Sequence, residues 1–149
     1  MTTRTKAEMA DIKRMIRRAD DRFVGAEKAA HRIDTTQGEY DSNFEGVVAG
    51  INFVVAAHIL ATTGIRRKVD EASAPTLIAS VISAIKSSDV PNVPSLQRLT
   101  NLNARRNASG HQGEWLDGID TDALEDAVEA GRSILHAVEA DLRQKGIAI

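Results

Sequence analysis

The stretch from Gly46 to Ile65, GVVAGINFVVAAHILATTGI, contains no Asp, Glu, Lys or Arg. A helix of this length could span a bilayer, or it could be the buried central helix of a bundle. Asn52, His58 and two adjacent threonines interrupt its apolar character, and the segments on either side of it are amphipathic. We therefore interpret it as the central helix of a soluble bundle, with a membrane span as the alternative.

The first 34 residues carry apolar side chains at alternating steps of three and four, which predicts a long helix with one narrow apolar seam. Thr5 and Glu8 have the spacing of a capping box at its start, and Gly38 is the predicted stop after its end. The seam consists of Met9, Ile12, Ile16, Ala19, Phe23, Ala26, Ala30 and Ile33.

Cap and stop residues predict four further helices. The markers are Ser42 with Glu45 and Gly64 for the second, Pro75 for the third, Ser95 for a short fourth, and Asp120 or Asp122 for the last. No segment shows sustained apolar–polar alternation, so no strand is expected. With 149 residues the chain is long enough to bury one core of its own. The sequence therefore predicts a single domain, residues 1–149, folded as an all-α helical bundle of about five helices.

Charge is unevenly distributed along the chain, although the net charge is only −2. Residues 1–34 carry nine basic and six acidic side chains, whereas residues 114–149 carry three basic and nine acidic ones. An anionic partner is therefore expected to meet the N-terminal part or the arginine-rich middle. The absence of cysteine and of an apolar leader favours a cytoplasmic location, without thiolate chemistry.

The segment RNASGH, from Arg106 to His111, covers the predicted end of the fourth helix, near Ala108, and the start of the turn before the fifth. Arg106 follows Leu102 by four residues and so continues the apolar side of its helix, whereas Arg105 falls on the outer side. An inward cation needs an anion or a water-filled cleft, because an unpaired buried charge is costly; alternatively, it caps the last carbonyls of its helix. Together with His111, Arg106 would suit metal-free RNA cleavage, because His exchanges protons near neutral pH and Arg stabilises the charge on a phosphate.

RNASGH resembles the signature of the HEPN (higher eukaryotes and prokaryotes nucleotide-binding) domain family, in which an Arg, commonly followed by a polar residue such as Asn, precedes a His by a few positions. The resemblance implies an all-α, metal-independent endoribonuclease of toxin–antitoxin or defence systems, usually a homodimer that brings two motifs to one cleft. It implies Arg106, Asn107 and His111 as catalytic residues, RNA as substrate, no cofactor, and an antitoxin or regulatory protein as a further partner. Some family members carry a Tyr that can be nucleotidylated two residues after the His, where this chain has Gly113.

Four further residues are candidates for contact with RNA. Arg105 suits a backbone phosphate, and Trp115 could stack on a base, although packing over its turn is the simpler interpretation. Arg17 and Arg18 belong to a basic group, with Lys13, Arg14 and Arg22, that could guide RNA electrostatically or could be a solvated helix face.

The histidines outside the motif have structural interpretations. His58 is expected to be a hydrogen-bonded core residue, and His31 and His136 are expected on the surface. No spacing of His and carboxylates predicts a metal site. The alternative to a nuclease is a non-catalytic helical module for protein interaction or nucleotide binding, in which Arg106 only caps a helix.

Overall fold

The computed structural model describes residues 3–67, 74–91, 97–98, 100–101 and 121–149. Within these ranges the regular structure is entirely helical, which confirms the predicted all-α bundle. The bounded helices are α1 (Lys6–His31), α2 (Gln37–Thr63), α3 (Ala74–Ser87) and α5 (Thr121–Gln144). Four helices packed together are thus seen in the described chain rather than about five. The predicted fourth helix lies mostly outside the described residues, but 97–98 and 100–101 are helical.

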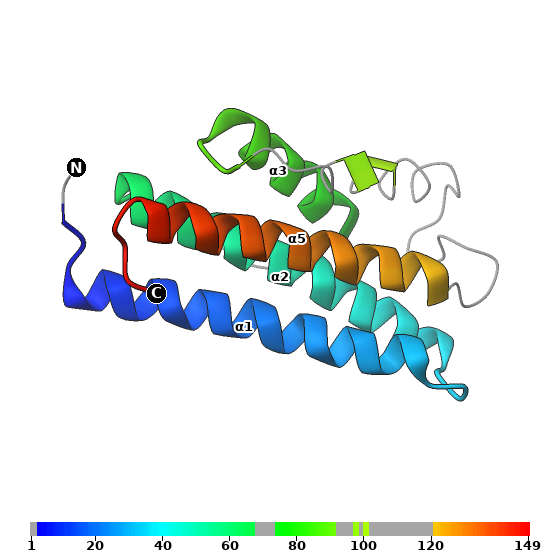
Figure 1. Cartoon of the computed structure of the whole chain (residues 1–149). Helices are drawn as coiled ribbons and strands as arrows, with labels where there is room; N and C mark the ends of the chain where they lie inside the picture. The colour runs from blue at the N-terminus through cyan, green and yellow to red at the C-terminus, as the bar shows by residue number, and fades with distance from the viewer. Residues whose placement is uncertain (1–2, 68–73, 92–96, 99, 102–120) are drawn as a thin grey trace.

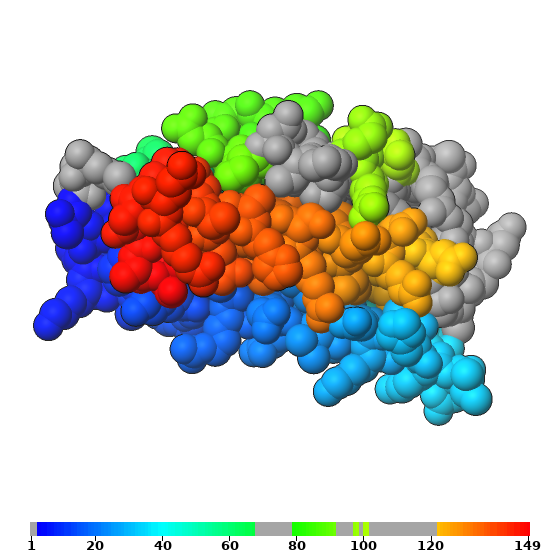
Figure 2. Space-filling model, in the orientation of Figure 1, coloured from blue at the N-terminus to red at the C-terminus, as the bar shows by residue number. Residues whose placement is uncertain are grey.

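The helices are arranged around α2. α1 and α2 form an antiparallel hairpin, and α5 lies along both of them, antiparallel to α1 (Figure 1). Of the bounded helices, α3 packs against α2 alone. Figure 2 shows the C-terminal residues lying against α1 beside the end of α5, where Ile147 and Ile149 pack on the core. Among the bounded helices, α2 is therefore the one that contacts all the others.

The uncharged stretch predicted as a central helix is buried as expected. α2 has the length and the hydropathy, 1.7, of a membrane span, but 78% of its most apolar window is buried inside the bundle. Such burial is typical of the core helix of a soluble protein, and the structure is consistent with one. Two polar residues of the stretch, Asn52 and His58, are buried with hydrogen-bond partners.

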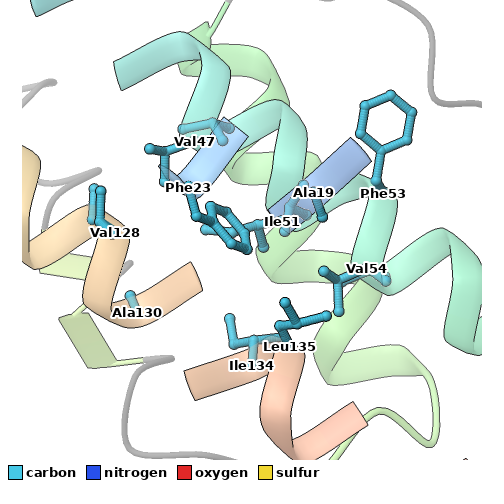
Figure 3. Close-up of a cluster of buried hydrophobic side chains, with 14 of the residues drawn as sticks. Ala19, Phe23, Val47, Ile51, Phe53, Val54, Val128, Ala130, Ile134 and Leu135 are labelled. Carbon is cyan, nitrogen blue, oxygen red and sulfur yellow. The ribbon is translucent and has the colours of Figure 1, made fainter. Parts of the chain in front are cut away.

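The core joins α1, α2 and α5 through the ring of Phe23, which is fully buried (Figure 3). A Cβ atom placed on Gly50 of α2 would lie 2.9 Å from Phe23 Cε1, and one placed on Gly131 of α5 would lie 2.6 Å from the same atom. The ring therefore lies between the backbones of α2 and α5, which can approach it this closely because both positions are glycine. Gly50 thus allows a close intramolecular approach of α1 and α2.

The first helix begins where predicted, with the Thr5–Glu8 capping box formed in both directions. Its end was predicted too late. α1 stops at His31, and Ile33, assigned to the apolar seam, is fully exposed in the connection to α2. The buried Thr35 hydroxyl donates to the carbonyl of Ala29 (2.7 Å), which satisfies one of the free carbonyls of this helix end.

The second helix begins earlier than the Ser42–Glu45 pattern predicted. Its N-cap is Thr36, whose hydroxyl accepts from the backbone N–H of Glu39 at 3.2 Å. Gly38, predicted as a stop, lies in the first turn of α2 instead, and Ser42 lies inside the helix. The predicted end is confirmed, since Gly64 caps α2 in the left-handed conformation, with φ of 75°.

The contact at Phe23 gives a direct test of packing. We expect Gly131→Ala to lower the free energy of unfolding by about 1–3 kcal/mol, because the new methyl group overlaps the ring and neither helix can withdraw without losing core contacts. Gly25→Ala, on α1 where an added Cβ meets nothing within 4 Å, is the matched control and should raise it by up to about 1 kcal/mol. Chemical denaturation measures both. Equal effects of the two substitutions would show that Phe23 does not hold α5 closely.

Candidate nucleic-acid interface

The predicted catalytic residues Arg106, Asn107 and His111, together with Arg105 and Trp115, lie outside the described residues. The structure resumes at Thr121, the first residue of α5. The long amphipathic helix predicted after the motif is therefore present, with Leu124, Val128, Leu135, Val138 and Leu142 buried.

Arg17 and Arg18 are described, and they lie on different sides of α1. Both side chains are exposed. Arg18 lines a groove with Arg14 of α1 and with Arg66 and Arg67, which follow the end of α2. Arg17 lines a separate groove between α1 and α5. The basic group predicted from the sequence is thus divided between two surfaces.

The first of these surfaces, which we call the arginine groove, has a volume of about 260 Å³. Its apolar lining comes from Met15, Phe53, Ala56 and Leu60, and its charged lining from Asp11, Arg14, Arg18, Arg66 and Arg67. Four arginines face one aspartate, an excess of three positive charges. Arg22, one turn beyond Arg18, lies over the ring of Phe53 at 5.7 Å from its centroid.

Asp11 partly neutralises one end of the arginine groove. Its carboxylate accepts a hydrogen bond from Arg66 Nη1 at 2.7 Å and is also paired with Arg14. Arg18, by contrast, has no acidic partner in the described part of the chain. Exposed ion pairs of this kind contribute little to stability, so Arg14 and Arg66 can exchange Asp11 for another anion at small cost.

Arg67 is the most enclosed cation of the arginine groove. Its Nε donates to Asn52 Oδ1 and its Nη2 donates to Ser80 Oγ, each at 2.8 Å. Burial lowers the pKa of Arg67 from its ordinary value. Both partners are neutral, and no carboxylate among the described residues pairs with this guanidinium. Asn52 of α2 and Ser80 of α3 therefore orient Arg67, but neither neutralises its positive charge.

Sequence analysis missed Arg66 and Arg67 as functional candidates, because they belong to a charged run after the second helix. A signal was nevertheless present. They follow the Gly64 stop by two and three residues, so they must lie at the C-terminal end of α2. In an antiparallel hairpin that end lies beside the N-terminal half of α1, where the basic residues gather.

The groove that contains Arg17 has a different charge balance. Lys13 and Arg17 face Asp20 and Glu139, so two positive charges meet two negative ones, with His136 beside them. Its volume is about 420 Å³. A surface with balanced charge attracts a polyanion much less than one with an excess of three.

The buried histidine links α2 to α5, as predicted for a core residue. His58 is completely buried, and its Nε2 lies 2.7 Å from Asp141 Oδ2. Since the carboxylate can only accept, Nε2 carries the hydrogen. Lys145 Nζ donates to the same oxygen at 2.6 Å. The hydrogen bonds from Lys145 and then His58 hold the pKa of Asp141 below its ordinary value of 3.8. His31 and His136 are exposed, also as predicted.

No group of three or more His, Cys, Asp or Glu within the described ranges could hold a metal ion. No family model, no curated protein and no solved structure matches the chain. The sequence motif and the surfaces described above are therefore the features that indicate a function.

Asp141 makes the acid stability of the bundle testable. The ionised carboxylate contributes stability above its unfolded-state pKa, and this contribution is lost as pH falls through the lower folded-state value. We expect Asp141→Asn to be less stable than the parent at neutral pH and to lose less stability between about pH 5 and pH 2.

Denaturation at a series of pH values measures this difference. The control is Asp126→Asn, exposed on the same helix and without a hydrogen bond in the described structure, which should retain the parent's slope. Identical acid slopes for the parent and Asp141→Asn would contradict the assignment.

Proposed function

We propose that the chain is a metal-independent endoribonuclease of the HEPN type, in which Arg106, Asn107 and His111 form the catalytic motif. The observation that carries the proposal is the segment RNASGH, placed before the long closing helix of an all-α bundle. The sequence predicts an Arg at a helix end and a His before the next helix, which is the arrangement that the family resemblance implies. The arginine groove supports RNA as the partner, because it supplies an excess of positive charge.

The proposed reaction is an internal transesterification. The ribose 2′-oxygen attacks phosphorus, the 2′-hydroxyl proton passes to a base, and the bond from phosphorus to the 5′-oxygen breaks. The leaving 5′-oxygen takes up a proton, so the products are a 2′,3′-cyclic phosphate and a 5′-hydroxyl. The imidazole of His111 transfers one of these protons, and the Arg106 guanidinium stabilises charge on the phosphorane-like transition state. Asn107 holds the geometry through hydrogen bonds.

The proposed biological setting follows from the same resemblance. The enzyme acts in the cytoplasm as a toxin or a defence effector, and two copies join so that their motifs face one cleft. An antitoxin or a regulatory protein restrains it. These assignments predict that the protein is a homodimer in solution, which its mass by analytical ultracentrifugation will show.

The decisive substitution is His111→Ala. Because general acid–base groups contribute about 10²–10⁴-fold to rate, we expect it to slow RNA cleavage by at least about 100-fold. The assay incubates purified protein with total RNA and a chelator, and it detects 2′,3′-cyclic phosphate ends. His136→Ala is the matched control, since this exposed histidine of α5 lies outside the motif.

Two results would reject the nuclease. One is a His111→Ala protein that cleaves as fast as the parent, and the other is a parent that yields no cyclic ends. The second result would favour the non-catalytic interaction or nucleotide-binding module.

A further inference from the structure

We propose that the arginine groove binds the phosphate backbone of single-stranded RNA, with Arg14, Arg18, Arg66 and Arg67 as its contacts. The identity of the ligand as RNA rests on the proposed function. The location of the site rests on the geometry of the described residues alone. Of the basic residues on the first helix, Arg14 and Arg18 thus contact RNA, whereas Arg17, the neighbour of Arg18, does not.

The arrangement of the cations suits a ligand with repeating charges. Arg14 and Arg18 are four residues apart on α1, and Arg22 continues the row, so their backbone positions rise by about 6 Å per step along one side of the helix. Arg66 and Arg67 extend the positive surface across the end of α2. A single phosphate would occupy one part of this surface, whereas a polynucleotide backbone would contact several parts at once.

The surroundings of the cations strengthen their attraction for phosphate. The floor of the arginine groove is apolar, formed by Met15, Phe53, Ala56 and Leu60 of α1 and α2. A low-dielectric wall beside a charge reduces screening by water. Arg67 adds a half-buried cation that Asn52 and Ser80 hold in place, so little conformational entropy is lost when it receives a phosphate oxygen.

The competing surface on α1 provides a matched comparison within the same protein. Lys13 and Arg17 are also four residues apart and exposed, but their groove contains Asp20 and Glu139. Replacing either pair by alanine removes two positive charges from the same helix. The two pairs carry the same charge and differ in their neighbours and in one Lys in place of an Arg, so a difference in RNA binding would not be an effect of net charge.

The experiment measures binding of a fluorescently labelled short oligouridylate by anisotropy, with chelator present and His111→Ala in every protein to prevent cleavage. We expect Arg14→Ala/Arg18→Ala to weaken binding at least tenfold at about 0.15 M salt, where the Debye length is about 8 Å. The slope of log affinity against log salt should become less steep by about 0.7 for each phosphate contact removed. Lys13→Ala/Arg17→Ala should bind within about twofold of the parent, since long-range charge alone has a small effect at this ionic screening. Circular dichroism verifies that both variants fold.

Each outcome separates this proposal from the nuclease. Equal weakening by both double variants, or by neither, would overturn the arginine groove as the binding site even if the protein with His111 intact cleaves RNA. Selective weakening by the Arg14/Arg18 variant supports the site, and it does so even if that protein shows no cleavage, in which case the nuclease alone fails. The proposal would also be overturned if inorganic pyrophosphate displaced the labelled RNA as strongly as unlabelled RNA does. That result would show a site for a small phosphate anion instead of a polynucleotide backbone.

Discussion

The packing of Phe23 between Gly50 and Gly131 is the constraint on which the rest of the bundle depends. One ring touches the backbones of α2 and α5, and a side chain at either glycine would overlap it. The contact therefore sets the distances between three helices at one level. Once those distances are set, the alanines of α1 and the branched residues of α2 fill the remaining core. The same alignment places the basic side of α1 against the end of α2.

Helical periodicity predicted most of this architecture, and the prediction failed where two local signals competed. The seam of α1, the stop at Gly64 and the buried face of α5 follow from the spacing of apolar residues. That spacing did not predict where the connection between α1 and α2 ends. Two residue pairs, Thr36 with Glu39 and Ser42 with Glu45, have the same capping pattern, so either could start α2. Gly38 favoured the later pair. In the folded chain Tyr40 is fully buried, and the earlier cap is the one that places this ring in the core.

The candidate surfaces were harder to predict than the helices, for a geometric reason. A helical pattern shows which residues share a side of one helix, but it does not show which neighbour that side meets. Arg17 and Arg18 are adjacent in the sequence and meet different helices. Arg66 joins Asp11 across 55 positions, and His58 joins Asp141 across 83. Such partners depend on the order and direction of packed helices, which no local spacing encodes.

The two buried polar residues of α2, Asn52 and His58, have a common role. Asn52 accepts a hydrogen bond from Arg67, and His58 donates one to Asp141. Each buried side chain thus orients a charged group that lies nearer the surface. Were α2 to face lipid, both polar side chains would lose these partners, and an unsatisfied polar group in hydrocarbon costs several kcal/mol. Their positions are thus explained by a helix enclosed in protein. The central helix is mostly buried from Val47 to Ala61, yet through these two residues it positions two charged groups at separate places on the bundle.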